Sequence, residues 1–390
     1  MKKLHNVIIA GAGPAGASDA VTLGSSRYAV LLLHKKSFPR DKICGDGITY
    51  KALPMLKKLG VLDQIITKEN FKSHGYTLIF KDNSKLSVEF HDSHKKPIYI
   101  IARNKFDNIL VEKATSYPNV TFLPDTNLAG LTPEGDGVVT RDGITFRGSM
   151  IIDATGFNSI LAKNNRDKKK SALAVRGYYN NVSDLNHTIE LYFSDEVLPG
   201  YFWVFPTSEN TANVGCGTFM NIVEEKKIDL KALMHDFVNN HPIASKKFKN
   251  ATLEGKLEGG KIPLAFGDFT WPRIKGNLIP IGDAGGFVNP ITAEGISYAI
   301  ATGIFAGEAL HDYFENDNDR VQLGNFRRNW QKSFARQYKM GDIYLDPLLP
   351  DDVRKYVMGS LDTSIDRTNL ASPAETYEYL VRMKVLTKSF

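Results

Sequence analysis

The chain has 390 residues, with 49 Lys and Arg against 43 Asp and Glu, and only two cysteines. Its 42% apolar and 24% charged residues exclude a disordered or fibrous chain, and its length allows two or three domains or one large α/β enzyme with insertions. The net charge of +6 permits contact with an anionic lipid or an acidic cofactor, but it is too small to indicate nucleic-acid binding.

The first predicted elements form a β-α-β unit at the N-terminus. Residues 6–10 are typical of a short buried strand, residues 14–23 of a helix with a proline near its first turn, and residues 28–33 of a second apolar strand. Lys2 and Lys3 precede this apolar stretch, but its glycines, its proline and the lack of a clear cleavage site argue against a signal peptide. We expect the unit to be part of the folded protein.

A glycine-rich turn joins the first strand to the helix and has the GxGxxG pattern. In this context the first glycine permits a tight turn, the second lets the backbone approach a pyrophosphate, and the third lets the helix pack close to the strand. The helix N-terminus would then hold the phosphates. The predicted dinucleotide-binding residues are Gly11, Ala12, Gly13, Pro14, Ala15 and Gly16.

His34 follows the second strand, where this kind of site normally has an Asp or Glu that binds the adenosine ribose. A ring nitrogen of histidine can still bond a ribose hydroxyl, without the charge assistance of a carboxylate. His34 and Lys35 are therefore candidate cofactor residues. The alternatives are an altered site and a histidine that faces solvent at the end of a strand.

The rest of the chain alternates between helical and β-rich segments. We predict helices over 49–62, 104–116, 230–240 and 294–312, short antiparallel strands within 75–101, and strands at 120–123, 137–140, 143–147 and 150–153. Further strands are predicted at 172–179, 188–193, 200–205, 211–218 and 277–281, and residues 316–390 are expected to be mostly helical. The sequence contains no uninterrupted run of 18 apolar residues, so we predict no membrane-spanning helix. The basic run 166–170 is expected to be a solvated loop.

Three further segments, read together with the GxGxxG turn, resemble a known family. They are RDKICGDG at 40–47, MIIDATGFNS at 150–159 and GNLIPIGDAGGFVNPITAEGIS at 276–297. In this order they resemble the FAD-dependent oxidoreductases of the geranylgeranyl reductase family, within the larger group typified by p-hydroxybenzoate hydroxylase. The resemblance runs from the first strand to about residue 310.

The resemblance implies FAD as the cofactor and a set of residues that hold it. Asp283 matches an aspartate near the ribityl or pyrophosphate part of FAD, and the backbone of Gly295 and Ile296 would face the flavin pyrimidine ring. The other cofactor residues that it implies are Arg40, Cys44, Gly45, Arg103 and Gly156, with Lys42 flanking the loop that covers the cofactor. We find no second GxGxxG for NADPH, so NADPH would dock transiently or another reductant would serve.

PGYFWVFP at 199–206 resembles the YxWxFP motif of the reductases, with Tyr201, Trp203 and Phe205 in the matching places. An aromatic wall of this kind suits a long isoprenoid chain, so these three residues are predicted to bind substrate. The resemblance also implies an active-site role for Cys44, whose thiol could give a proton to a substrate carbon. We place Cys44, Tyr201 and Trp203 in the predicted catalytic site; an inert cysteine and an ordinary core strand are the alternatives.

The leading hypothesis is an FAD-dependent reductase that saturates C=C bonds of an isoprenoid or similar lipid by hydride from flavin N5. An FAD-dependent monooxygenase or halogenase acting on an aromatic or carrier-bound substrate is the second hypothesis, and a nucleotide-binding protein without turnover is the third.

Because Cys44 and Cys216 are far apart and form no CxxC pair, we expect no metal site, no disulfide and a cytoplasmic setting. The basic residues Arg327, Arg328, Lys332 and Arg336 could touch an anionic membrane surface, although a solvated helical face is the simpler interpretation.

Taken together, these patterns predict an α/β protein (α+β overall). A Rossmann-like FAD-binding domain would be discontinuous, over residues 1–70, 100–165 and 265–330. An antiparallel β-sheet substrate domain, over residues 71–99 and 166–264, would be inserted into it, and residues 331–390 would form a helical C-terminal region. The sequence leaves the oligomeric state open.

Overall fold

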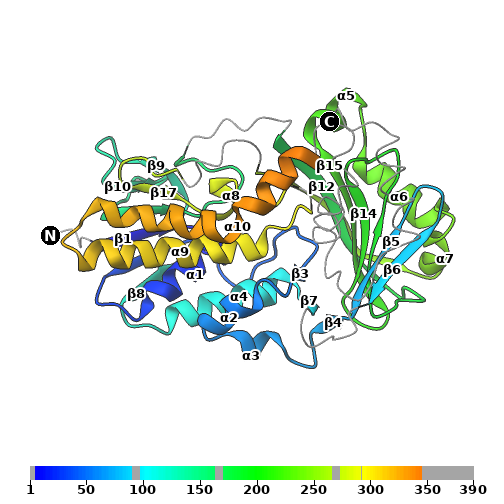
Figure 1. The fold of residues 1–390 in the computed structure, drawn as a ribbon, viewed down its shortest axis with the longest axis horizontal. Coiled ribbons are helices and arrows are strands. Elements are labelled where there is room, and N and C mark those ends of the chain that lie inside the picture. The colour runs from blue at the N-terminus through cyan, green and yellow to red at the C-terminus, as the bar shows by residue number, and fades with distance from the viewer. Residues whose placement is uncertain (1–4, 90–96, 163–169, 266–272, 291, 345–390) are drawn as a thin grey trace.

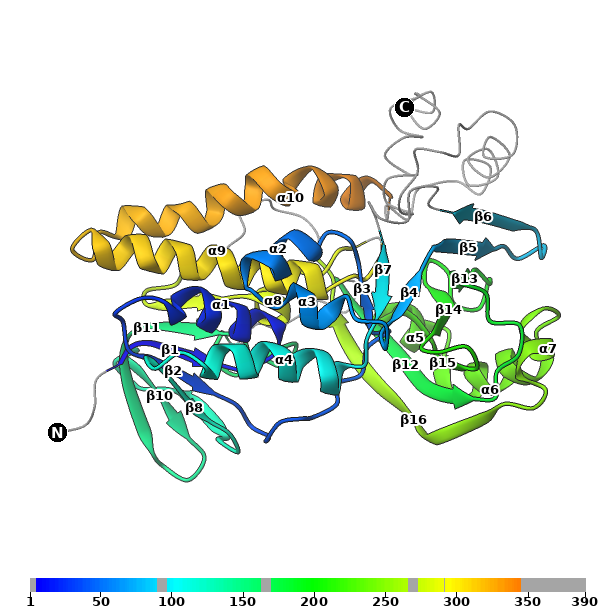
Figure 2. The ribbon, with the colours of Figure 1, turned by 90° about the horizontal axis from the view of Figure 1, so that it is seen from below.

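The computed structural model describes residues 5–89, 97–162, 170–265, 273–290 and 292–344. Two seven-stranded sheets lie in separate halves of the molecule, and a small three-stranded sheet lies between them (Figures 1 and 2). The protein is thus a mixed α/β protein, as the sequence predicts. Among the described residues, no helix is long and apolar enough to cross a membrane.

The first sheet contains the β-α-β unit. Its order is β8 (Val120–Leu123), β2 (Val30–Leu33), β1 (His5–Ala10), β11 (Thr145–Asp153), β10 (Gly137–Thr140) and β9 (Leu128–Leu131), with β17 (Leu278–Pro280) also paired to β11. Strands β8, β2, β1, β11 and β17 pair in parallel, whereas β9 and β10 are antiparallel to their neighbours. The parallel strands therefore end at one edge of the sheet, where the glycine-rich turn begins.

Helices cover one face of this sheet and explain its apolar strands. Val7 and Ile9 of β1 pack into the core beneath α1 (Pro14–Gly24), α4 (Arg103–Thr115) and α9 (Ile296–Glu315), whereas Ile8 and Ala10 pack on the opposite face. Since both faces are buried, the strand is continuously apolar from Val7 to Ala10 instead of alternating. Helix α10 (Gly324–Tyr344) packs along α9 (Figure 2). Its Phe326, Trp330 and Phe334 are buried, whereas the basic Arg327, Arg328 and Lys332 are exposed.

The second sheet has the order β16 (Thr252–Pro263), β12 (Ser171–Asn180), β15 (Thr211–Phe219), β14 (Tyr201–Pro206), β13 (Ile189–Tyr192), β5 (Gly75–Ile79) and β6 (Lys85–Glu89). All its pairs are antiparallel except β13 with β5. Helices α6 (Leu230–Asn240) and α7 (Ala244–Phe248) pack on one face, beside α5 (Met220–Glu225). The other face is apolar and includes Trp203, Leu191 and Ala174. Its strands come from 75–89 and 171–263, and the division into domains stays a prediction.

Several predicted elements are wrong in extent or pairing. The single helix over 49–62 is instead α2 (Leu53–Lys58) and α3 (Leu62–Ile65), separated at Gly60, whose positive φ of 70° ends the first helix. The two strands at 143–147 and 150–153 form one strand, β11, which changes partner from β10 to β1 near Gly148. The last buried helix begins at Ile296 and not at 294.

The segment 75–101 does not form one antiparallel sheet. Strand β7 (Ile98–Ile100) leaves it and pairs with β3 (Gly47–Ile48) and β4 (Phe71–Ser73) in the three-stranded sheet. Periodicity could not reveal this, because pairing partners are set by tertiary packing. Most of the basic run 166–170, and residues 345–390 of the predicted helical C-terminal region, lie outside the described residues.

Candidate functional site

The glycine-rich turn folds back so tightly that two of its positions exclude any side chain. Gly11 has a φ of 110°, and a Cβ atom there would lie 2.2 Å from the carbonyl oxygen of Ala154. A Cβ atom on Gly16 would lie 1.9 Å from the carbonyl oxygen of Gly11. Glycine is therefore required at both positions by the fold itself, for the turn and for the packing of α1 against it.

Gly13 differs because it faces open space. It precedes α1 as the N-cap residue, no side chain caps the helix there, and the nearest heavy atom to an added Cβ would be Arg40 Nη2 at 3.8 Å. Pro14 and Ala15 are buried in the first turn. The N-terminus of an 11-residue helix with an open glycine in front fits a pyrophosphate group, since its amide hydrogens lack acceptors within the helix.

His34 lies against the glycine-rich turn and does not simply face solvent. The backbone N–H of Ala12 donates to His34 Nδ1 at 3.1 Å, and Arg40 Nε lies 3.2 Å from His34 Nε2. Burial, and then the charge of Arg40, lower the pKa of His34 to about 4, so the ring is neutral at pH 7. Both ring nitrogens thus face a donor, and because a neutral imidazole accepts at only one nitrogen, it can take only one of these two bonds at a time. Lys35 is exposed.

We expect His34→Ala to weaken FAD binding about tenfold, because it removes the imidazole that accepts from Ala12 and so supports the glycine-rich turn. The same variant should lose part of the acid sensitivity of folding. The pKa of His34 is lowered from 6.5 to about 4, so its contribution to stability disappears as the pH falls between these values.

FAD titration followed by fluorescence, and denaturation at several pH values, measure the two effects. His235→Ala is the matched control, because His235 is exposed on α6 in the other half of the molecule. Equal FAD affinity in His34→Ala and the control would contradict the role of His34.

Arg40, Arg103 and Asp107 form a buried charge cluster beside the turn. Arg103 begins α4 and donates to Asp107 from Nε at 2.7 Å and from Nη2 at 2.8 Å, and Arg40 Nη1 donates to the same carboxylate at 2.5 Å. Burial alone would raise the pKa of Asp107, but the two guanidinium groups outweigh it and hold the pKa below its ordinary value. Both Arg103 and Asp107 are buried, so their ion pair is not a surface contact.

The segment 40–47, called here the Cys44 loop, lies between this cluster and the second sheet. Cys44 is half-buried, its carbonyl accepts from Asn213 Nδ2 at 2.7 Å, and it lies near Arg103. Burial raises the pKa of the Cys44 thiol, whereas the positive charge of Arg103 lowers it. Burial raises the pKa of Cys216 to about 12, and its side chain lies in the core of the second half.

Strand β14 brings its aromatic side chains to the Cys44 loop. A Cβ atom on Gly45 would lie 3.0 Å from the Phe205 ring, so the loop packs directly on it. Trp203 is 8% exposed, and its indole N–H donates to Asn213 Oδ1 at 3.0 Å. The hydroxyl of Tyr201 donates to the carbonyl of Thr292 at 2.7 Å, just before α9. The three predicted substrate residues thus lie along one strand between two predicted cofactor segments.

Asp283 and Gly295 are brought together from two ends of the same motif. Asp283 lies in α8 (Gly282–Gly285), its Oδ2 is 2.8 Å from Lys42 Nζ, and its Oδ1 would lie 3.7 Å from a Cβ atom on Gly295. Gly295 is the N-cap of α9, has no side-chain cap and is followed by the buried Ile296. The ion pair between Lys42 and Asp283 thereby joins the Cys44 loop to α8, beside the N-terminus of the 20-residue helix α9.

The parallel strands explain why these distant segments meet. The glycine-rich turn follows β1, His34 follows β2, Gly156 lies just after β11, and Asp283 follows β17. These strand ends share one edge of the first sheet, which is where open α/β sheets bind their ligands (Figure 1). Gly156 has a φ of 91° and no heavy atom within 4 Å of an added Cβ, so it also faces open space.

Sequence reasoning missed several residues that shape the site. Asp107, Asp46 of the Cys44 loop, and the strand residues Asn213 and Tyr178 were not among the predicted site residues. Asn213 lies in ANVGCG beside the aromatic motif, but its contact with the Cys44 loop joins residues 169 apart in sequence. No local pattern signals such a contact.

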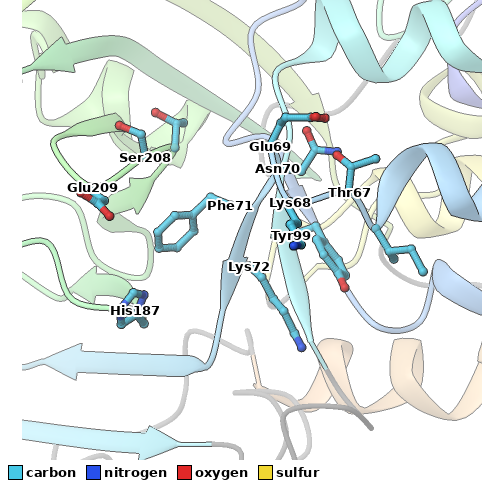
Figure 3. A pocket seen from close by; sticks show the side chains of 12 residues that line it. Thr67, Lys68, Glu69, Asn70, Phe71, Lys72, Tyr99, His187, Ser208 and Glu209 are labelled. Carbon is cyan, nitrogen blue, oxygen red and sulfur yellow. The ribbon is translucent and has the colours of Figure 1, made fainter.

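A separate pocket of about 590 Å³ opens beside the three-stranded sheet (Figure 3). Phe71 and His187 lie toward one side of it, and Tyr99 and Lys72 toward the other. Its remaining lining residues are Ile66, Thr67, Lys68, Glu69, Asn70, Thr207, Ser208 and Glu209. None of Tyr201, Trp203 and Phe205 lines this pocket, so it is distinct from the site predicted from the sequence.

Among the described residues, no cluster of His, Cys, Asp and Glu could hold a metal ion.

Comparison with known proteins agrees with the geometry of the turn and strand ends. Residues 5–316 match the family described as FAD binding domain. The chain is 28% identical over 388 residues to a digeranylgeranylglycerophospholipid reductase of Methanosarcina mazei, covering 95% of this chain and 92% of the relative. It is 26% identical over 329 residues to a menaquinone reductase of Mycolicibacterium smegmatis, covering 80% and 77%.

A solved structure shares the whole fold. A geranylgeranyl bacteriochlorophyll reductase-like protein from Thermoplasma acidophilum superposes with a TM-score of 0.86 at 20% sequence identity. The alignment covers 100% of this chain and 99% of the other. The arrangement of two large sheets is therefore that of a known fold.

Proposed function

Because this chain belongs to the FAD-binding domain family and is an FAD-dependent oxidoreductase, we propose that it reduces C=C bonds of an isoprenoid or similar lipid-like substrate. The observation that carries the proposal is the contact of the aromatic strand β14 with the Cys44 loop. An apolar chain laid along this strand would pass beside the only half-buried thiol among the described residues. The names of the two curated relatives support a substrate of this class.

The described residues fit FAD at the edge of the first sheet. Gly13 leaves room for a pyrophosphate in front of α1, and His34 accepts from the backbone N–H of Ala12 and so supports the turn beside it. Gly295 and Asp283 lie together at the N-terminus of α9, whose amide hydrogens would favour negative charge on the flavin ring. When bound there, FAD would supply hydride transfer to a substrate carbon.

The protein must then provide a proton and a dry, shaped cavity. The Cys44 thiol is suited to hold that proton, because burial raises its pKa and keeps the sulfur protonated at neutral pH. The hydroxyl of Tyr201 and the indole N–H of Trp203 already donate to Thr292 and Asn213. These bonds favour a wall-forming role for both side chains, with the proton coming from Cys44 or water.

Anaerobic incubation of the chemically reduced enzyme with a geranylgeranyl lipid tests the proposal. Mass spectrometry should show that the lipid gains two hydrogens for each double bond reduced, and Cys44→Ser should slow this gain.

Membrane contact is tested by comparing the turnover rate of the lipid in anionic vesicles with that in neutral vesicles. Faster turnover on anionic vesicles at low salt would support membrane contact by the exposed Arg327, Arg328 and Lys332.

The second candidate function, oxygenation or halogenation of an aromatic or carrier-bound substrate, predicts the opposite result. Unchanged double bonds, together with oxygen-dependent modification of such a substrate, would overturn the reductase proposal.

The electron donor is identified in the same experiments by replacing chemical reduction with NADPH. Rapid flavin bleaching by NADPH would favour it over another reductant.

A further inference from the structure

Asp46 is a fully buried carboxylate on the Cys44 loop that none of the roles above uses. Its backbone is left-handed, with a φ of 65°, and its side chain is 0% exposed. Oδ2 accepts from the Tyr178 hydroxyl at 2.5 Å and from Asn213 Nδ2 at 2.8 Å. Oδ1 is buried and has no hydrogen-bond partner among the described residues. A buried carboxylate that is only half satisfied is costly, so its position calls for a functional reason.

The carboxylate is joined to both the thiol loop and the aromatic strand through one amide. Asn213 Nδ2 donates to Asp46 Oδ2 and to the carbonyl of Cys44, and Asn213 Oδ1 accepts from Trp203 Nε1. Both ends of the amide are therefore used, which fixes its orientation. Asn213 and Trp203 lie on the neighbouring strands β15 and β14. The network holds the loop at the sheet in one arrangement.

Asp46 also acts on the Cys44 sulfur from within the same loop. Burial raises the pKa of the Cys44 thiol most, and the negative charge of Asp46 also raises it. The positive charges of Arg103 on α4 and of Lys42 lower this pKa, as does the hydrogen bond from the backbone N–H of Asp46 to the sulfur. Cys44 in turn contributes, after burial and Glu294, to raising the pKa of Tyr201 of β14. Burial raises the pKa of Asp46 itself to about 6, against its bonds with Tyr178 and Asn213 and the charges of Arg103 and Arg176. At pH 7 and above, Asp46 is therefore mostly a carboxylate.

We propose that Asp46 is a positioning residue for Cys44: through Asn213 it fixes the Cys44 loop on strands β14 and β15, and its charge opposes that of Arg103 at the sulfur. The proposal deepens the function proposed above and rests on it for its meaning in the reaction. Without Asp46 the thiol would lose its proton more readily beside Arg103 and would be held less firmly. A smaller fraction of the thiol would then still carry, at neutral pH, the proton that it must donate.

The pH dependence of Cys44 alkylation tests this directly. Iodoacetamide reacts with thiolate, and mass spectrometry of the FAD-loaded protein can follow Cys44 alone, because Cys216 is fully buried. Asp46→Asn keeps an oxygen acceptor for Tyr178 and Asn213 but removes the charge. We expect the midpoint of its alkylation profile to move to lower pH, with an increase of about three- to tenfold in rate at pH 7.

Asp46→Gly separates the charge from the anchoring. Glycine accepts the φ of 65° and removes the hydrogen bonds as well as the charge. The midpoint of the alkylation profile should therefore fall as in Asp46→Asn. The alkylation rate at the high-pH plateau should be higher in Asp46→Gly than in Asp46→Asn, because the loop is no longer anchored. Asp317→Asn is the matched control, since Asp317 has a φ of 52° and is exposed far from the loop. If Asp46→Asn does not fold, Asp46→Gly still reports the midpoint.

An unchanged midpoint in both Asp46 variants would overturn the proposal. So would equal plateau rates in Asp46→Asn and Asp46→Gly, or a thiol that stays unreactive at every pH in Asp46→Gly. The alkylation readout does not depend on the substrate. If it behaves as expected while no lipid is reduced, the proposed function fails and the positioning of Cys44 by Asp46 stands.

Discussion

Gly13→Val should give a folded protein that is colourless after purification and binds FAD at least about 100-fold more weakly than the natural chain. The reason is that the side chain would occupy the approach of the pyrophosphate to α1. Within the protein it meets little, because the nearest heavy atom to the new Cβ is Arg40 Nη2 at 3.8 Å. The φ of −75° at this position is also accessible to valine. Binding should therefore be lost without loss of the fold.

Absorbance of the purified protein, FAD titration and thermal unfolding of the FAD-free protein measure these effects. The matched control is Gly130→Val, because Gly130 lies on β9 and has no heavy atom within 4 Å of an added Cβ. This control should stay yellow and should unfold like the natural chain. A yellow Gly13→Val protein with ordinary FAD affinity would show that the pyrophosphate lies elsewhere.

Asp107→Asn should lower the free energy of unfolding by about 3–5 kcal/mol. The substitution leaves Arg103, which is 3% exposed, without its carboxylate and also removes the partner of Arg40. The two guanidinium groups would then repel each other in a poorly solvated place. Because these arginines flank the Cys44 loop and the glycine-rich turn, FAD affinity should fall as well.

Urea denaturation at neutral pH measures the stability change, with Glu315→Gln as the matched control. Glu315 pairs with Arg27 across exposed surface, where the side chains are 41% and 73% exposed, and such pairs contribute at most about 1 kcal/mol. The pKa of Asp107 is held below 3.8, so its contribution is present above that value and is lost as the pH falls below it. The stability difference between the natural chain and Asp107→Asn should therefore shrink in strong acid. A loss as small as that of the control would contradict the importance of the cluster.

Much of the first sheet and of the cofactor edge could be predicted from the sequence. Continuous apolar runs at β1, β2 and β17 indicate strands that are buried on both faces, and this is how the structure arranges them. The atom that excludes a side chain at Gly11 belongs to Ala154, just after the distant strand β11. The requirement for glycine at 16 is local, because the excluding atom is the carbonyl oxygen of Gly11 in the same turn. Short-range geometry of this kind is encoded in a few neighbouring residues.

The structure decided what contacts are made over long separations in the chain. Hydrophobic periodicity predicted most strands of the second sheet, but the parallel pairing of β13 with β5 and the departure of β7 depend on which faces must be buried against each other. The charge cluster joins Arg40 to α4, and Asn213 joins the Cys44 loop to β15. A side chain's partner across 67 or 169 residues leaves no local pattern, since it is selected by packing and by the need to satisfy buried polar groups.

The sequence by itself therefore determined the dinucleotide-binding turn, because that turn acts through local backbone geometry, and the resemblance of its motifs to a known family implied FAD as the cofactor. Only the tertiary structure decided the surroundings of Cys44. Arg103 of α4 acts on the thiol through its charge, and Asn213 and Trp203 hold the Cys44 loop through hydrogen bonds to the Cys44 carbonyl and to each other. These residues come from three segments far from Cys44 in the chain, and only folding brings them to the loop. The acidity of a side chain is a property of that assembled environment, and no motif in one segment contains it.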